Sequence, residues 1–288
     1  MGSRIPSVST LVVLGAGELG GAVARQAASA AVTRRVVLVD DALDVARGKA
    51  LDIQQAAAID GVAVTLSGTG DIGAVVGAAV VVLADRHGAP PAGANEDAAV
   101  RELSHVRALN PRALIVCAGA TAFDAIERFV HEGDADAGRV VGSAPEALRS
   151  GLVALTALAA RAAPRDISLM LVGRPPREAV VLWNDAAIAG RRATGVLTPQ
   201  DIARLEARVP HLWPPGPLTL AGAAMRVVAL ALSNGAGTPA VFVVPAGAKG
   251  VRRRGAALPA VVRAEGVTPV WPDLSPRDRM RLETALAD

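Results

Sequence analysis

A glycine-rich turn near the start of the chain constrains the fold more than any other feature. The turn GAGELG at Gly15–Gly20 follows the continuous apolar run Thr10–Leu14 and opens an alanine-rich stretch, Glu18–Ala30, that favours a helix. A continuous apolar run is typical of a parallel strand covered on both faces. A strand, a Gly-x-Gly-x-x-Gly turn and a helix form the first unit of a doubly wound, dinucleotide-binding sheet.

Glycine is required at each of the three positions of the turn for a different physical reason. Gly15 allows the tight turn, Gly17 lets a pyrophosphate approach the backbone, and Gly20 lets the helix pack closely on the sheet. The first turn of a helix also presents unpaired N–H groups and a partial positive charge to phosphates. The turn therefore predicts a dinucleotide site with its phosphates at the start of this helix.

Asp40 ends the second apolar run and stands twenty residues after Gly20. A carboxylate at this place accepts hydrogen bonds from both ribose hydroxyls and repels a 2′-phosphate, which predicts NAD as the cofactor in preference to NADP. The alternative is a purely structural turn in which Asp40 or Asp41 caps the next helix.

Apolar runs and helix-like stretches alternate over the first half, which predicts a parallel sheet with crossover helices. The second half has shorter strand-like pieces and reads as an α+β domain, so we expect domains at 1–145 and 146–288. The expected strands are Thr10–Leu14, Val36–Val39, Val62–Leu66, Val80–Leu83, Leu114–Cys117, Arg139–Val141, Ile167–Val172, Ala179–Trp183, Ala240–Val244 and Val267–Trp271. The expected helices are Glu18–Ala30, Ala42–Ala58, Glu96–Leu109, Ala147–Ala162, Gln200–Arg208, Gly222–Leu232 and Pro276–Ala287, with Pro210–Pro217 as a loop.

The composition argues against a nucleic-acid-binding, a secreted and a membrane-spanning protein. Thirty basic residues stand against 27 acidic ones, and the chain has no tyrosine, three Phe and three Trp, so neither a basic patch nor a base-stacking surface is expected. We expect no signal peptide in residues 1–10 and no membrane span. The single cysteine, Cys117, lies in an apolar run and is expected in the core, in keeping with a cytoplasmic protein.

Three further segments carry a family resemblance: GKALDI at Gly48–Ile53, SGTGDI at Ser67–Ile72 and LSPRDRMRL at Leu274–Leu282. From about residue 9 to its C-terminus the chain resembles the lactate/malate dehydrogenase family. The resemblance implies a Rossmann-type NAD-binding domain, an α+β second domain, a small carboxylate ligand and a homo-oligomer, either dimer or tetramer. The cofactor contacts that it implies are Gly15, Gly17, Glu18, Leu19, Gly20, Asp40, Ala84 and Val116.

The chemistry of that family uses a histidine to move the hydroxyl proton, within a Gly-x-His-Gly turn of the second domain. Here the corresponding turn is GRPPR at Gly173–Arg177, and Pro175 falls at the histidine position. The chain has His87, His105, His131 and His211, so no histidine lies between residues 132 and 210. The family's general acid and base is therefore not matched.

The family also holds its substrate's carboxylate with arginines, because a guanidinium donates two parallel hydrogen bonds to a carboxylate. In the loop after the fourth expected strand, Asn95 stands where the family has an arginine, and Arg86 at the loop's entrance is a candidate carboxylate ligand or a solvated strand-end residue. The family's Asn-Pro after the fifth strand is Ala118-Gly119 here.

The family's Asp…Arg pair on the first helix of the second domain is ambiguous in this chain. Aligned without gaps, the two positions are Leu148 and Gly151; shifted by two residues, Glu146 and Arg149 keep the spacing and share a helix face. Arg149 is thus a second candidate carboxylate ligand, and a plain ion pair is the alternative.

These departures leave three interpretations. The first is an NAD(H)-binding family member that has lost hydride transfer and acts as a sensor, scaffold or partner subunit. The second is an active oxidoreductase with a rebuilt site that uses Arg86, Arg149 or Arg174. The third is a folded relic, which the intact glycine turn and Asp40 disfavour. The first is preferred, because a histidine, an arginine and an amide that act as a unit are all unmatched.

Overall fold

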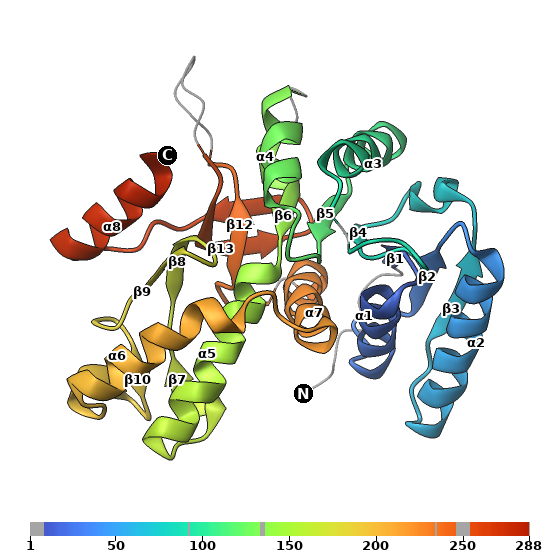
Figure 1. Ribbon diagram of the computed structural model, residues 1–288. Coiled ribbons are helices and arrows are strands. Elements are labelled where there is room, and N and C mark those ends of the chain that lie inside the picture. Colours follow the sequence, from blue (N-terminus) through green and yellow to red (C-terminus); the bar gives the residue numbers. More distant parts are fainter. Residues whose placement is uncertain (1–8, 92, 133–135, 234, 246–253, 288) are drawn as a thin grey trace.

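Six parallel strands form one half of an eleven-stranded sheet, in the order β3-β2-β1-β4-β5-β6 (Figure 1). The computed structural model describes residues 9–91, 93–132, 136–233, 235–245 and 254–287; residues 1–8, where no signal peptide is expected, lie outside this part. The strands are β1 (Thr10–Leu14), β2 (Arg35–Val39), β3 (Thr65–Thr69), β4 (Val80–Leu83), β5 (Leu114–Cys117) and β6 (Val140–Gly142). The predicted doubly wound α/β class is confirmed.

The second half extends the same sheet with antiparallel strands, β12-β13-β8-β9, and β14 pairs with β13. A separate small sheet has the order β11-β10-β7. Here the strands are β7 (Ile167–Ser168), β8 (Leu171–Arg174), β9 (Glu178–Val181), β10 (Ala187–Ile188), β11 (Arg191–Arg192), β12 (Ala240–Val243), β13 (Ala256–Arg263) and β14 (Gly266–Pro269).

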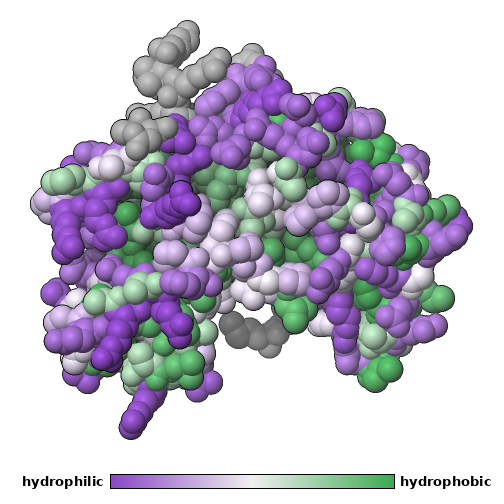
Figure 2. Space-filling view, in the orientation of Figure 1, coloured by the Kyte–Doolittle hydropathy of each residue, from purple (hydrophilic) through white to green (hydrophobic). Residues whose placement is uncertain are grey.

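Helices cover both faces of the sheet. In the first half they are α1 (Glu18–Ser29), α2 (Leu43–Ile59), α3 (Glu96–Leu109) and α4 (Phe123–Glu132), and in the second α5 (Ala144–Ala160), α6 (Pro199–Arg208), α7 (Pro217–Ser233) and α8 (Pro276–Ala287). The 3₁₀ turns are η1 (Ile72–Val75), η2 (Ala137–Arg139), η3 (Pro164–Asp166), η4 (Ala193–Gly195) and η5 (Val209–Leu212). Most of the visible surface is polar, with apolar residues interspersed over α2 and the lower ends of the helices (Figure 2).

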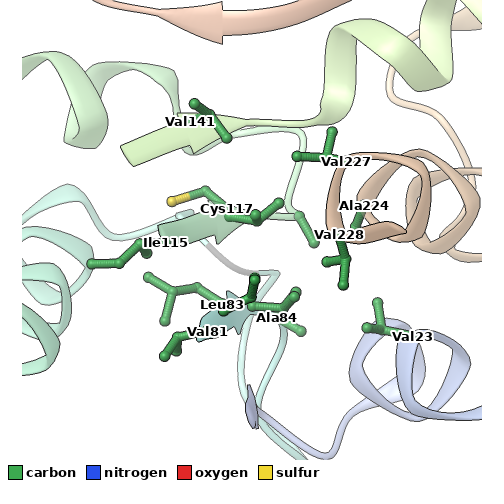
Figure 3. Close-up of a cluster of buried hydrophobic side chains, with 14 of the residues drawn as sticks. Val23, Val81, Leu83, Ala84, Ile115, Cys117, Val141, Ala224, Val227 and Val228 are labelled. Carbon is green, nitrogen blue, oxygen red and sulfur yellow. The ribbon is translucent and has the colours of Figure 1, made fainter. Parts of the chain in front are cut away.

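Helix α7 joins the two halves. It packs against both α1 and α5. Its inner face meets the ends of β4, β5 and β6 in one cluster of buried side chains (Figure 3), which includes Val23, Leu83, Cys117, Val141, Ala224, Val227 and Val228. The predicted domain boundary at 145/146 falls near the start of α5 and stays a prediction. The large sheet and this core include residues from both sides of it.

No single helix among the described residues is long and apolar enough to cross a membrane. One bent pair, Pro199–Leu212 with Pro217–Ser233, passes such a test by length and composition, but its two parts meet at 97°. Within that pair, α7 places much of its apolar surface in the core described above.

The third strand is shifted from its predicted position. Val62–Leu66 was expected and β3 runs over Thr65–Thr69, because the N–H of Val62 instead donates to the carbonyl of Ala57 and closes the end of α2. Strand β3 is an edge strand with few buried side chains, so its apolar pattern is weak. In the SGTGDI segment, close packing on α2 requires the glycine at position 68, since a Cβ on Gly68 would lie 2.3 Å from the carbonyl carbon of Ala46.

The second half departs further from the sequence-based expectation. The single strand expected over Ile167–Val172 is two, β7 and β8, which join different sheets. Strand β13 was not expected; its run contains Pro259, and a proline is unusual in a central strand. Helix α4 was not expected either. The expected loop Pro210–Pro217 overlaps η5 and ends where α7 begins.

Candidate functional site: a crevice between the first and fourth strands

The candidate site is the edge of the sheet at the carboxyl ends of β1 and β4, called the crevice below, where the order of the parallel strands reverses. Strands β1 and β4 are neighbours, although β2 and β3 lie between them in sequence. In doubly wound sheets, ligands bind outside the carboxyl ends of the strands at this switch point. Here the glycine turn follows β1 and the segment Ala84–His87 follows β4. Of the predicted cofactor contacts, only Val116 lies away from this edge, fully buried within β5.

The glycine turn adopts a conformation that needs glycine. Gly15 has a φ of +106°, in the range that side chains disfavour, and its N–H donates to the carbonyl of Val39 at 2.8 Å. A Cβ on Gly20 would lie 1.9 Å from the carbonyl oxygen of Gly15. The start of α1 therefore lies directly against the turn, as expected for the first and third glycines.

The start of α1 holds an internal anion. The carboxylate of Asp85, just after β4, accepts hydrogen bonds from the N–H groups of Glu18 (2.9 Å) and Gly20 (2.9 Å). The N–H of Gly17 donates to the backbone carbonyl of Asp85 at 2.8 Å, and a Cβ on Gly17 would lie 2.3 Å from Oδ2 of Asp85. The sequence analysis missed Asp85. The signal that could have found it is an acidic residue two positions after the end of β4, at the switch point of the sheet.

The carboxylate of Asp40 is bound by backbone amides. It is 1% exposed and accepts from the N–H groups of Ala16 (2.6 Å), Ala42 (2.9 Å) and His87 (2.9 Å). Burial by itself would raise the pKa of Asp40, but these amides and the positive charge of Arg86 outweigh it and lower that pKa below its ordinary value. The bond from the N–H of Ala42, two residues along the chain, closes an Asx turn just before α2, and no side chain caps that helix.

Arg86 bridges two sides of the crevice. Its guanidinium lies 3.0 Å from Asp41, after β2, and 2.6 Å from Glu102 on α3. Burial opposes its charge, but the acidic neighbours Glu102, Asp41 and Asp40 raise the pKa of Arg86 overall. Its side chain is 30% exposed, so it is not a freely solvated strand-end residue. The described part of this segment is tied to both α3 and the end of β2.

A largely apolar cavity of about 300 Å³ lies beside this crevice, between the two halves of the chain. Its walls include Glu18 and Asp85 from the crevice, Gly119 after β5, and Pro214 and Leu220 around the start of α7. No histidine, lysine or arginine is among the described residues that line it. The cavity therefore has room for a small ligand, but no positioned cation or imidazole on its wall.

No family model matches this chain. Malate dehydrogenase of Pelagibacter ubique is 46% identical over 57 residues, a segment that spans 20% of this chain and 18% of that relative. Lactate dehydrogenase of Cryptosporidium parvum, solved with lactic acid and β-nicotinamide adenine dinucleotide, superposes with a TM-score of 0.85 at 20% identity, over 97% of this chain and 95% of that one. Malate dehydrogenase of Plasmodium falciparum with NADH gives 0.86 at 17%, over the same shares. This chain has the lactate/malate dehydrogenase fold.

Within the lactate/malate dehydrogenase fold, the predicted pair on α5 forms a closed network. Arg149 donates to the 2% exposed carboxylate of Glu146 at 2.5 and 2.8 Å, and to the carbonyl of Leu169 at 3.2 Å. Glu146 also accepts from the N–H of Ala240 (2.9 Å) and pairs with Arg226 (3.0 Å). The network faces a different cavity, of about 400 Å³, between α5 and α7. The structure does not bring Arg149 to the crevice.

Arg174 is the last residue of β8, and Pro175 follows it in the turn to β9. The guanidinium of Arg174 lies 2.7 Å from Glu127 and donates to the carbonyl of Gly255 at 2.8 Å, with its Cζ 5.6 Å from the ring centre of Phe242. Pro175 is buried in the turn. Pro175, predicted from the sequence to stand at the histidine position, is thus an apolar ring, and the neighbouring Arg174 is held by acidic residues of α4.

Other side chains that could take part in catalysis, such as the thiol of Cys117, are paired or buried. Burial raises the pKa of the Cys117 thiol to about 12, so the thiolate needed for nucleophilic chemistry does not form near neutral pH. In the part of the chain that the structure describes, no three His, Cys, Asp or Glu side chains gather to hold a metal ion. The site offers backbone amides and carboxylates at the crevice, and an apolar cavity beside it.

Proposed function

We propose that this chain is a divergent lactate/malate dehydrogenase family member that binds NAD(H) at the crevice and has lost hydride transfer between 2-hydroxy and 2-oxo acids. The observation that carries the first part is the pair of amides, Glu18 and Gly20, that converge on one carboxylate at the start of α1. Amides that bind a carboxylate in this way also suit a phosphate, because both are anions that accept from helix N-terminal N–H groups.

The crevice residues fit a dinucleotide once Asp85 has moved away. The amides at the turn would then hold the pyrophosphate, and Asp40, with three of about four acceptor positions in use, would hold a ribose hydroxyl. When bound, NAD(H) supplies a hydride acceptor or donor. This chain's own part is to bind the cofactor and to shield it from water with the apolar walls of the cavity beside Gly119 and Leu220.

The loss of chemistry rests on what the cavity wall lacks. A 2-oxo acid needs a proton donor within hydrogen-bond reach and a cation for its carboxylate. The three candidate arginines, Arg86, Arg149 and Arg174, are each paired with a glutamate of this chain. For this reason an active enzyme with a rebuilt site remains the second choice, and a role in sensing, as a scaffold or as a partner subunit is preferred.

Calorimetric titration with NADH and NADPH tests the binding proposal. We expect NADH to bind and NADPH to bind more weakly, because a 2′-phosphate would meet the negative charges of Asp40 and Asp41. If neither nucleotide binds at millimolar concentration, to the wild type or to a variant without the Asp85 carboxylate that occupies these amides, the cofactor proposal is wrong. A preference for NADPH would show that the charge at Asp40 does not select the cofactor.

A further inference from the structure

We propose that Asp85 is an internal competitor of the dinucleotide, so that the resting protein keeps its own cofactor site closed. This rests on the proposed NAD(H) binding and goes beyond it: the cofactor binds only when the carboxylate of Asp85 has left the start of α1. An autoinhibitory contact of this kind would make occupancy of the site depend on the conformation of the segment after β4.

The competition follows from geometry. The two carboxylate oxygens of Asp85 each accept one of the amides, those of Glu18 and Gly20, that a pyrophosphate would need. The space above Gly17 is filled as well, because even a single added carbon would lie 2.3 Å from Oδ2 of Asp85. The same two amides cannot bind Asp85 and a phosphate at once.

The rest of the segment closes the crevice further along. The N–H of His87 donates to the carboxylate of Asp40, the group proposed to hold a ribose. Arg86, between Asp85 and His87, bridges Asp41 on one side and Glu102 on the other. Three consecutive residues thus each contact a group at the crevice's edge, and these contacts hold Asp85 in place.

The glycine turn is held in the same arrangement from the other side. Lys49, from the GKALDI segment on α2, donates from Nζ to the carbonyl of Gly17 at 2.7 Å. The amides of Glu18 and Gly20, just after Gly17, donate to the carboxylate of Asp85. This cradle, the glycine turn with the amides at the start of α1, is therefore formed before any ligand arrives. A ligand must change the position of Asp85 and not the shape of the turn.

A site that is open in only a fraction of molecules has its apparent affinity reduced by that fraction. Removing the carboxylate should therefore strengthen NADH binding. Because two charge-assisted hydrogen bonds hold Asp85, we expect a gain on the order of ten- to a hundredfold in D85A. D85N should give a smaller gain, since its amide accepts only one of the two N–H groups well.

The experiment compares the full-length wild type, D85A, D85N and the control D52A by titration with NADH and with inorganic pyrophosphate. D52A removes an exposed carboxylate from α2 without touching the crevice, so it measures the effect of net charge alone. Thermal melting of each variant shows that it is folded, and D85N, nearly isosteric with the wild type, provides a second test if D85A is unstable.

Tighter NADH and pyrophosphate binding in D85A and D85N than in the wild type and D52A is the expected result. Equal affinity in all four proteins overturns the competition and leaves NAD(H) binding in place. Absence of binding in every protein, at millimolar NADH and pyrophosphate, overturns both the competition and the proposed cofactor. A gain in D52A equal to that in D85A would assign the effect to charge alone and would also overturn the competition.

Discussion

Glu146 and Arg149 stand one turn apart on α5, and the guanidinium of Arg149 donates to both oxygens of the Glu146 carboxylate. The pair has the spacing of a substrate-binding motif, but its arginine binds an internal carboxylate that is 2% exposed. Because Glu146 also accepts from the N–H of Ala240 on β12, the pair ties α5 to the sheet. Its role in the structure is to fasten α5 to β12.

Removal of this carboxylate should destabilise the protein strongly. E146A leaves the largely buried guanidinium of Arg149 and the N–H of Ala240 without their acceptor, and breaking a buried pair costs about 3–5 kcal/mol. Urea denaturation measures the free energy of unfolding. The control E132A removes an exposed partner of Arg128 and should cost less than about 1 kcal/mol. Equal losses in the two variants would show that the network around Glu146 contributes little.

Asp40 should make stability depend on pH at the acid end. Its pKa is lowered in the folded state, so its contribution is present above the unfolded value of about 3.9 and is lost as pH falls through the lower, folded value. In D40N this contribution is absent at every pH, and the amide nitrogen faces backbone donors, which should cost about 1–3 kcal/mol at neutral pH. The difference between wild type and D40N, measured by denaturation from pH 7 to pH 2, should shrink below about pH 4. A difference that is constant with pH would contradict the role of the charge.

Turnover of oxaloacetate or pyruvate with NADH should be close to background. Positioned acid–base catalysis contributes on the order of 10²–10⁴-fold, and Pro175 supplies none of it. P175H should recover little, because no arginine among the residues lining the cavity would hold the substrate's carboxylate. A steady-state assay of wild type and P175H decides this, with NADH titration of both as the binding control. Turnover of about 1–10³ s⁻¹ would show an active site elsewhere.

The chain should form a homo-oligomer through its exposed apolar helix residues. Ile59 on α2 is 88% exposed, Leu158 on α5 76% and Leu218 on α7 73%, and a homodimer interface would bury apolar side chains of this kind. Light scattering should give a dimer or tetramer at micromolar concentration, and L158K or I59K should shift it toward the monomer. The matched variant R165K, at an exposed arginine, should leave the mass unchanged. A monomeric wild type would contradict this prediction.

Much of the first half could be predicted because its signals are local. Strands such as β1 and β4 are continuous apolar runs, and each is predicted with its exact bounds. The second half was predicted less well, because β7, β8 and β13 depend on which sheet accepts them and not on their own periodicity. Pro259 shows this directly: it lies within β13, where strand propensity alone argues against a strand.

The sequence by itself determined the glycine turn before a helix and the absence of any histidine between residues 132 and 210, since both depend only on which residues stand where. The occupant of the cradle was decided only by the tertiary structure. Asp85 reaches the amide of Glu18 across 67 residues of sequence, because β4 crosses back to lie beside β1. No local pattern records that contact: it exists only when the sheet places the ends of the two strands together.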